Sequence, residues 1–489
     1  MFVEKIIIRD SPGETISALL SGGRLVEFLI DRVGGASLVG NIYLGRIRIV
    51  NKSLGAAFVN IGESRDGFLA LPEIRPLGKV SGTISDFAKE GESILVQVQR
   101  DPIEEKGVKL TCHIHLAGAF LIFRPYQKEV TVSRRILDKD KRIHLKEIAS
   151  KFLLKGGGFI VRTNADGATD KQIEEEAIYL ISYWYEIIKD LNTVQPPSCI
   201  FSEINLSCQA IRNYCNKSLV EIIIDGTDSF CHIKNFCQSR FPWLTARVLS
   251  YKGSSDIFER YGVAEEMDTA LSEKVRLVGG GLLIINQTPA FCSIDVNTGG
   301  AKSNSPEQTA IDVNFQAASE VAFQIRLRNI SGLIIVDFVS LKDANHKKAI
   351  LDLLKESAKA DPLGLNIVGF TRLGLVEMTR QRNGLSLHHI VSGIELHEVA
   401  KSAESQAIEA LRQVMSEVRS CANISGVANV LLKAPIEVIA ELEGAGGDKT
   451  TASMALDEAQ LKLGLAINLE VNQDLSNGRF EVFVSNGKN

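Results

Sequence analysis

The sequence has no long uninterrupted apolar run: no stretch approaches the roughly 18 residues that mark a membrane-spanning helix. Residues 1–10 mix charged side chains into a short apolar run, so the apolar core of a signal peptide is missing as well. Both absences predict a cytoplasmic protein without a membrane span.

A cysteine framework is also lacking. The eight cysteines are scattered along the chain without a CxxC pair, and their spacing is not that of a small disulfide-bonded scaffold. We therefore expect reduced thiols that mainly serve packing.

The chain carries no excess of positive charge. With 55 Lys and Arg against 59 Asp and Glu, the formal net charge is −4, which argues against a simple polycationic nucleic-acid binder. Local patches matter more: residues 124–146 are basic, and five arginines surround the acidic motifs described below. These are Arg326, Arg328, Arg372, Arg380 and Arg382. A merely solvated surface is the alternative interpretation for part of both groups.

The length of 489 residues exceeds one ordinary hydrophobic core, so about two to four domains are expected. Hydrophobic residues make up 45% of the chain and charged residues 23%, which is typical of globular proteins. A substantial core can therefore form.

Two short apolar runs each end in an aspartate. The first reads Ser-Ile-Asp295-Val-Asn297-Thr-Gly-Gly, and the second reads Leu-Ile-Ile-Val-Asp337-Phe. Burying a carboxylate without a cation is costly, so two that converge imply a shared positive charge. Magnesium binds through one or two carboxylates plus substrate phosphates, and the Asn297 amide suits a ligand or a substrate contact. The alternative is that these side chains hydrogen-bond the turns that follow them.

The segment between the two runs predicts one amphipathic helix. From residue 306 to residue 329, apolar residues recur every four positions. They are Val313, Ala317, Val321 and Ile325. The strand–helix–strand order brings Asp295 and Asp337 to neighbouring strands of one sheet.

Three ordered motifs cover residues 281–300, 324–338 and 372–382. They read Gly-Leu-Leu-Ile-Ile-Asn-Gln-Thr-Pro-Ala-Phe-Cys-Ser-Ile-Asp-Val-Asn-Thr-Gly-Gly, then Gln-Ile-Arg-Leu-Arg-Asn-Ile-Ser-Gly-Leu-Ile-Ile-Val-Asp-Phe, then Arg-Leu-Gly-Leu-Val-Glu-Met-Thr-Arg-Gln-Arg. Together they closely resemble the ribonuclease E/G family.

The resemblance implies a magnesium-dependent endoribonuclease of single-stranded RNA that prefers 5′-monophosphorylated ends and leaves a 5′-phosphate and a 3′-hydroxyl. Ribosomal RNA processing or mRNA decay would be its setting. The resemblance places the catalytic magnesium on Asp295 and Asp337, and Asn297 at the scissile phosphate. The alternative is a non-catalytic RNA-binding protein that retains the fold.

Residues 36–112 are punctuated by glycine and contain short alternating runs at the spacing of a small β-barrel. This stretch resembles the OB-fold RNA-binding domain of the same family. Phe58 and Phe68 follow small residues near strand ends, where they are either stacking platforms for bases or core residues. The resemblance favours RNA contact, with Lys106 as a phosphate partner and Arg372 as a further RNA-binding residue.

A further strand ends in Arg162 and Thr163, within Gly-Phe-Ile-Val-Arg-Thr. A guanidinium fork beside a hydroxyl suits a terminal phosphate monoester. The resemblance makes this pair the sensor of an RNA 5′-monophosphate, helped by the backbone at Gly118 and Ile122. Without the resemblance, Arg162 would be an ordinary edge-strand arginine.

The resemblance covers nearly the whole chain and implies an α+β multidomain architecture. An OB-fold β-barrel is inserted in an RNase H-like subdomain, followed by a 5′-sensor subdomain, a DNase I-like catalytic subdomain and a small C-terminal α/β domain. The expected ranges are 1–35 and 206–270 for the RNase H-like subdomain, 36–112 for the barrel, 113–205 for the 5′ sensor, 271–390 for the catalytic subdomain and 391–489 for the C-terminal domain.

The chain departs from the family pattern in two places. The family's cysteine-containing zinc link after Arg-Gln-Arg has no counterpart, because the next cysteine is Cys421. Zinc is therefore not expected, since lone histidines at this spacing are more typical of surface or capping groups. The histidines concerned are His388, His389 and His397. A homodimer that does not depend on zinc is one assembly that the resemblance leaves open. Asn286 and Pro289 stand where the family usually has acidic residues.

Overall fold

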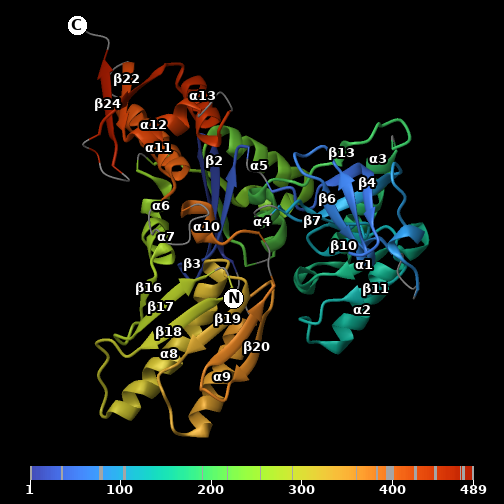
Figure 1. Ribbon diagram of the computed structural model, residues 1–489, viewed down its shortest axis with the longest axis horizontal. Coiled ribbons are helices and arrows are strands. Elements are labelled where there is room, and N and C mark those ends of the chain that lie inside the picture. The colour runs from blue at the N-terminus through green and yellow to red at the C-terminus, as the bar shows by residue number, and fades with distance from the viewer. Residues whose placement is uncertain are drawn as a thin grey trace. The chain divides into compact units, whose positions relative to one another are not determined.

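The computed structural model describes residues 3–34, 37–75, 81–102, 106–189, 191–216, 218–253, 255–288, 290–359, 361–381, 384–392, 401–422, 427–444, 449–473, 475 and 479–486. They belong to two compact units, one of residues 1–36 with 220–489 and one of residues 37–219. Both units mix helices and strands (Figure 1). Within the described ranges, no helix combines the length and the hydrophobicity that crossing a bilayer requires.

The unit of residues 37–219 contains a closed β-barrel of five strands. They follow one another in the order β4-β5-β6-β8-β7, and β7 pairs back onto β4, which is consistent with an OB-fold. Gly45 lets two strands approach closely, because a Cβ there would lie 2.5 Å from the Val59 side chain. The strands are β4 (Ile42–Asn51), β5 (Ala56–Asn60), β6 (Gly67–Ala70), β7 (Ser93–Arg100) and β8 (Lys109–Thr111), with β13 (Ser198–Phe201) added beside β4 and the short helix α1 (Leu71–Ile74) after β6.

A second sheet in the same unit has four strands in the order β11-β12-β10-β9. Its core includes the buried pair Phe123 and Phe159, whose ring centroids are 5.3 Å apart. Thr169 and Gln172 form a capping box that starts the long helix α3. The strands are β9 (Leu116–Ala117), β10 (Leu121–Arg124), β11 (Val130–Val132) and β12 (Gly158–Val161), and the helices are α2 (Lys139–Ser150), α3 (Asp170–Ile188) and α4 (Leu206–Tyr214).

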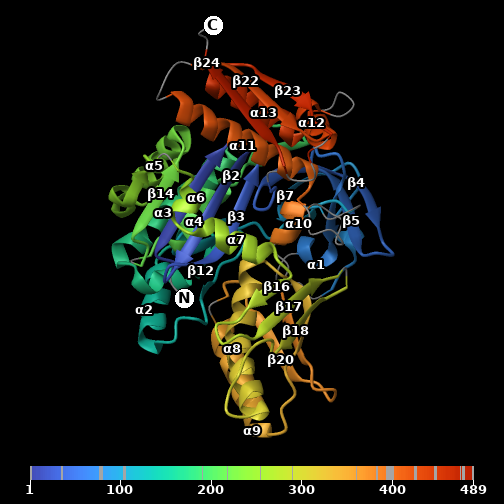
Figure 2. The ribbon, with the colours of Figure 1, turned by 90° about the vertical axis from the view of Figure 1, so that its left-hand side faces the viewer.

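In the other unit, a five-stranded sheet in the order β15-β14-β1-β2-β3 joins the N-terminal strands to strands from the middle of the chain (Figure 2). β1 pairs with β14 in parallel, and Ile7 of β1 packs in one core with Phe258 of α6. The elements are β1 (Lys5–Ser11), β2 (Glu14–Ser21), β3 (Arg24–Arg32), β14 (Glu221–Asp225), α5 (Thr227–Arg240), β15 (Val248–Ser250), α6 (Ile257–Arg260) and α7 (Val263–Leu271).

A six-stranded sheet follows in the order β16-β17-β18-β19-β21-β20, with α8 and α9 packed against one face (Figure 1). The predicted amphipathic helix is confirmed as α8, whose four apolar residues at four-residue spacing are all buried. The elements are β16 (Lys274–Arg276), β17 (Leu282–Gln287), β18 (Cys292–Asn297), α8 (Pro306–Leu327), β19 (Gly332–Asp337), α9 (Ala344–Ala358), β20 (Leu365–Phe370), β21 (Val376–Arg380) and α10 (Leu387–Ser392).

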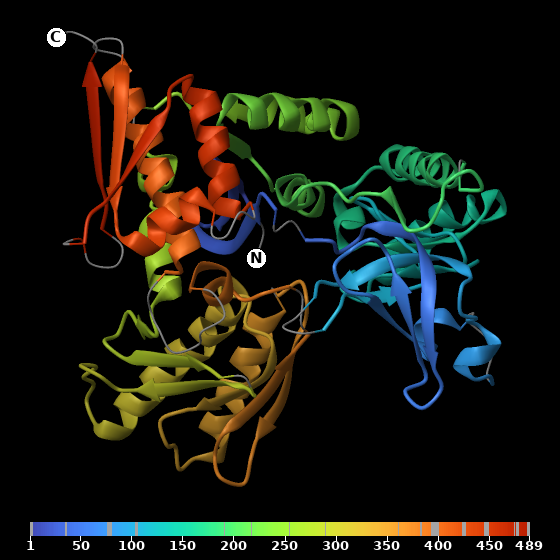
Figure 3. The ribbon, with the colours of Figure 1, turned by 45° about the horizontal axis from the view of Figure 1, so that its top comes forward.

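The C-terminal part is a three-stranded sheet, β23-β22-β24, that packs on three helices (Figure 3). Small residues such as Ala452, Ala455 and Ala459 bring α13 close to this core. The elements are α11 (Ala403–Ala422), β22 (Val427–Ala434), α12 (Ile436–Glu443), α13 (Thr451–Leu463), β23 (Ile467–Val471) and β24 (Glu481–Asn486).

Candidate active site and RNA-binding residues

Asp295 and Asp337 are direct neighbours in the six-stranded sheet. β18 and β19 pair in parallel with Asp295 in register with Asp337, as the strand–helix–strand pattern predicts. Their chain neighbours Ile294 and Val336 are buried on the helix-covered face. Because successive side chains alternate between faces, both aspartates point to the opposite face, where both are exposed.

Asn297 joins this pair from the same face of β18. Its side-chain amide donates a hydrogen bond of 2.7 Å to Oδ2 of Asp295. The Thr-Gly-Gly turn that follows requires glycine for its backbone conformation. Gly299 has a φ of +54°, and a Cβ there would lie 2.6 Å from the Gly280 carbonyl oxygen. In the described ranges, the Asp295 carboxylate makes no hydrogen bond to this turn, so the turn-capping interpretation has no support at that residue.

The three side chains fit a magnesium ion. Magnesium keeps several waters and takes one or two carboxylates plus substrate phosphates, rather than a cage made only of protein ligands. In the part of the chain that the structure describes, no three His, Cys, Asp or Glu side chains gather around one point. Two adjacent carboxylates with an oriented amide match an open site that a substrate phosphate would complete.

Arg372 lies at the same end of the sheet as Asp337. The turn of residues 371–375 connects β20 to β21, and Val376 of β21 pairs with Val336 of β19. The turn is closed by hydrogen bonds between Thr371 and Leu375, and Arg372 is exposed on it. An exposed cation thus lies next to the strand end that carries Asp337.

The other described arginines of the predicted cluster are buried and bound to other protein groups, so the solvated-surface alternative is wrong for them. Arg326 pairs with Glu27 at 3.1 Å. Arg380 is buried against Asp361 at 2.6 Å. Arg328 is also buried, and this burial lowers its pKa to about 10. Arg382 lies outside the described residues.

The departures from the family pattern are only partly described. Asn286 pairs with Ser293 across β17 and β18, whereas Pro289 lies outside the described residues. His388 and His389 belong to α10, where Ser386 contacts Nδ1 of His389 at 3.4 Å. Burial lowers the pKa of His388. His397 also lies outside the described residues.

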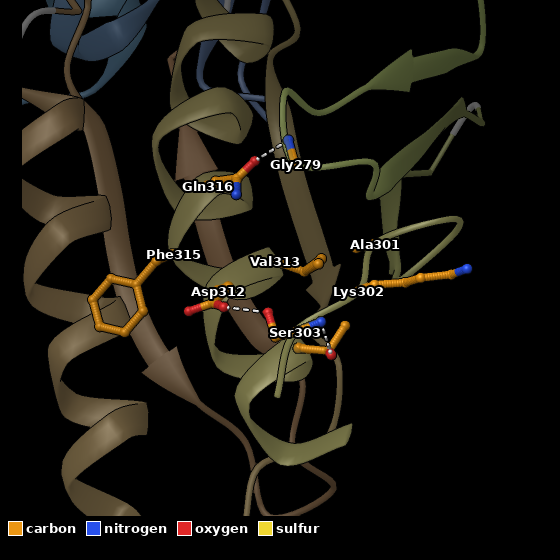
Figure 4. A pocket seen from close by; sticks show the side chains of 9 residues that line it. Gly279, Ala301, Lys302, Ser303, Asp312, Val313, Phe315 and Gln316 are labelled. Atoms are coloured by element: carbon orange, nitrogen blue, oxygen red, sulfur yellow. Dashed lines mark hydrogen bonds between the residues drawn. The ribbon is translucent and has the colours of Figure 1, made fainter. Parts of the chain in front are cut away.

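A cavity of about 390 Å³ lies beside the loop that follows Asn297 (Figure 4). Ser303 donates a hydrogen bond of 2.6 Å to Asp312 of α8, and Gln316 accepts one of 2.8 Å from the Gly279 N–H. Hydrogen bonds from Ser303 and Gln308 lower the pKa of Asp312. None of the three site residues lines this cavity. Its polar contacts fasten two segments to α8, the loop that contains Ser303 and the β16–β17 connection that contains Gly279.

The predicted 5′-end residues gather at one end of the strands β9, β10 and β12 of the four-stranded sheet. The Arg162 guanidinium donates to the Gly118 carbonyl and, at 2.8 Å, to Oδ1 of Asn213 in α4. Burial lowers the pKa of Arg162. The Thr163 hydroxyl is exposed and lies 3.0 Å from the Ser133 hydroxyl.

The two backbone positions differ in their surroundings. The Gly118 N–H donates to the Leu121 carbonyl at 2.8 Å, so a phosphate at this N–H would compete with that bond. Ile122 lies within β10, paired with Ala117 on one side and Ile160 on the other. Sequence reasoning missed Ser133 and Asn213, because neither belongs to a motif.

Phe58 and Phe68 pair across β5 and β6 on the outer face of the barrel. Their ring centroids are 5.9 Å apart, and both are half-buried while Ala57 and Leu69 fill the core. Both rings therefore lie outside the buried cluster of the barrel core. Phe68 is also in register with Lys109 of β8.

Lys106 is exposed and precedes Gly107, which approaches the barrel closely. A Cβ at Gly107 would lie 2.1 Å from the Asp66 carbonyl oxygen, so only glycine fits there. Since Asp66 comes directly before β6, Lys106 lies near the start of the strand that carries Phe68.

Most of the chain is similar in sequence to known ribonucleases. The family model described as the Ribonuclease E/G family matches residues 115–383. Ribonuclease G of Haemophilus influenzae is 35% identical over 399 residues, which cover 79% of this chain and 81% of that protein. Ribonuclease G of Escherichia coli is 32% identical over 426 residues, covering 84% and 87%. Ribonuclease E of Escherichia coli is 31% identical over 436 residues, covering 85% of this chain and 40% of that protein.

Proposed function

Because this chain belongs to the ribonuclease E/G family, we propose that it is a magnesium-dependent endoribonuclease of single-stranded RNA. The observation that carries the proposal is the in-register pair Asp295 and Asp337 on the exposed face of the sheet. Cleavage leaves a 5′-phosphate and a 3′-hydroxyl, and the setting is ribosomal RNA processing or mRNA decay in the cytoplasm.

Asp295 and Asp337 would hold the magnesium ion between them. When bound, such an ion activates water and neutralises charge at the scissile phosphate. Asn297 orients the Asp295 carboxylate through its 2.7 Å hydrogen bond and contacts the phosphate. Arg372 adds positive charge beside Asp337, where it attracts the RNA backbone.

RNA recognition uses the barrel face and the 5′-end residues. Phe58 and Phe68 form a surface on which bases stack, and Lys106 contacts phosphate. Arg162 and Thr163 bind the 5′-monophosphate with charge-assisted hydrogen bonds, helped by the backbone near Gly118 and Ile122. The enzyme therefore prefers 5′-monophosphorylated RNA.

Each sheet can be assigned to one subdomain of the proposed architecture. We assign the closed barrel to the OB-fold domain, the four-stranded sheet to the 5′ sensor and the five-stranded sheet to an RNase H-like subdomain. The six-stranded sheet is the DNase I-like catalytic subdomain, and the three-stranded sheet belongs to a small domain that would support a homodimer.

Replacing either carboxylate tests the metal site. Asp295→Asn or Asp337→Asn should lower cleavage of a single-stranded RNA by several orders of magnitude while RNA binding persists, because each change removes one of two metal ligands. Cleavage would be measured by gel electrophoresis with and without magnesium, and binding by fluorescence anisotropy.

Asp352→Asn is the matched control, since Asp352 is exposed on α9, which covers the opposite face of the sheet. It should cleave like the wild type. Undiminished turnover in either site variant would refute the assignment of Asp295 and Asp337 as metal ligands. A wild-type protein that binds RNA without cleaving it would instead support a non-catalytic RNA-binding protein.

A further inference from the structure

The turn of residues 118–121 holds Arg162 in place through hydrogen bonds. The Gly118 N–H donates to the Leu121 carbonyl at 2.8 Å and closes the turn. The Arg162 backbone N–H donates to the Phe120 carbonyl at 2.7 Å, and the Arg162 guanidinium donates to the Gly118 carbonyl. Arg162 is thus attached to this turn through both its backbone and its side chain.

The same turn is held from its other side by one carboxylate, that of Glu176 in α3. Glu176 accepts hydrogen bonds from the backbone N–H groups of Ala119, Phe120 and Leu121, at 2.6, 2.7 and 2.8 Å. Three successive N–H groups that converge on one anion form a concave anion site, and a protein carboxylate fills it here.

Only glycine at position 118 leaves room for the Glu176 carboxylate. A Cβ at position 118 would lie 2.6 Å from the carboxyl carbon of Glu176 and 2.7 and 2.8 Å from its two oxygens. The φ of Gly118 is not in the left-handed region, so the closeness of Glu176, rather than the backbone conformation, requires glycine.

We propose that Glu176 is the positioning residue of the 5′-end pocket: its carboxylate fixes the 118–121 turn, and the turn fixes Arg162 in the orientation that receives a 5′-monophosphate. This inference rests on the 5′-monophosphate preference proposed above. Glu176 acts through the turn and does not itself touch the RNA.

Two acceptor oxygens are needed for this role, because both accept backbone N–H hydrogen bonds. Burial raises the pKa of the Glu176 carboxyl, while the three backbone N–H bonds and Arg162 act in the opposite direction. A glutamine is close to glutamate in shape, but its NH₂ group would face a backbone N–H where an acceptor is required. Glu176→Gln therefore breaks part of the anchor with little change in volume.

The test compares cleavage of one RNA sequence with a 5′-monophosphate and with a 5′-hydroxyl. Glu176→Gln should lower the ratio of the two kcat/KM values by about tenfold, because charge-assisted hydrogen bonds to the 5′ phosphate depend on the orientation of Arg162. Cleavage of the 5′-hydroxyl RNA should stay within about twofold. Glu175→Gln, an exposed neighbour on the same helix, is the matched control and should leave the ratio unchanged.

Gly118→Ala gives a second route to the same loss, since its Cβ would displace the carboxylate. Arg162→Ala is run in parallel to separate the two proposals. Arg162→Ala could abolish the preference for 5′-monophosphorylated RNA while both Glu176→Gln and Gly118→Ala retain it. In that case the positioning role of Glu176 is wrong, and Arg162 keeps its proposed role as the 5′-phosphate sensor. An equal loss on both RNAs in Glu176→Gln would reveal a purely structural residue and overturn the role. A wild type without any preference overturns both.

Discussion

At the scale of single residues, Arg162 is the side chain on which the proposed 5′-end pocket mainly rests. Its guanidinium has five N–H donors in a planar fork. The bonds to Gly118 and Asn213 fix the orientation of this fork. A phosphate is recognised best by such a pre-oriented group, because little rotational freedom is lost on binding.

We therefore predict that Arg162→Ala lowers kcat/KM for 5′-monophosphorylated RNA by about tenfold to a hundredfold, the value of charge-assisted hydrogen bonds to one phosphate. The 5′-hydroxyl RNA should be cleaved at nearly the wild-type rate. Steady-state kinetics on the two RNAs measure this. Lys146→Ala, which removes an exposed cation of α2, should change neither value. Equal losses on both RNAs would show that Arg162 serves the fold or general RNA affinity.

Residue-level reasoning from the sequence identified groups that lie in motifs and missed those that support them. Asp295, Asn297 and Asp337 could be picked out because each occurs at the end of an apolar run. Glu176 and Asn213 could not, because their importance comes only from the turn and the guanidinium that they contact. Their separations from Gly118 and Arg162 along the chain carry no periodic signal.

At the scale of elements, alternation along strands decides which side chains are available. Ala57 and Leu69 point into the barrel, so Phe58 and Phe68 point outward together from the paired strands β5 and β6. The sequence could not settle this, because phenylalanine in a short alternating run suits either face. The buried face of α8 was predictable, since four apolar residues at four-residue spacing allow one orientation only.

We predict that Phe58→Ala and Phe68→Ala each weaken binding of single-stranded RNA by about tenfold, because stacking contributes roughly 1–3 kcal/mol per base. The loss should be the same for both 5′ ends. Fluorescence anisotropy at one fixed salt concentration would measure the Kd values. Leu54→Ala removes an exposed apolar side chain of the β4–β5 turn and should bind like the wild type. A change in the 5′-end preference, or no loss of affinity, would contradict the stacking role.

At the scale of the whole molecule, the family membership is the inference that the sequence supported most completely. Motifs over residues 281–382 identified it, and the matching relatives extend across most of the chain. The closed barrel was likewise expected from strand spacing and glycine placement. Assembly is the property that local patterns predict least well, because it depends on surfaces rather than on periodicity.

We predict that the purified protein carries no stoichiometric zinc, since the segment expected to hold the family's zinc link has no cysteine. Elemental analysis would measure zinc per chain. A chelator should stop cleavage only by removing magnesium, so added magnesium alone should restore it. One zinc per two chains would refute this prediction.

The register of β18 and β19 has a consequence for the stability of the sheet. It holds Asp295 and Asp337 next to each other on an exposed face, and like charges on neighbouring strands destabilise a sheet. Without a bound cation, neutral side chains at these two positions would favour folding. The two carboxylates that weaken the sheet are thus the ones that the proposed reaction needs, so the proposed activity lowers the stability of the sheet that carries it.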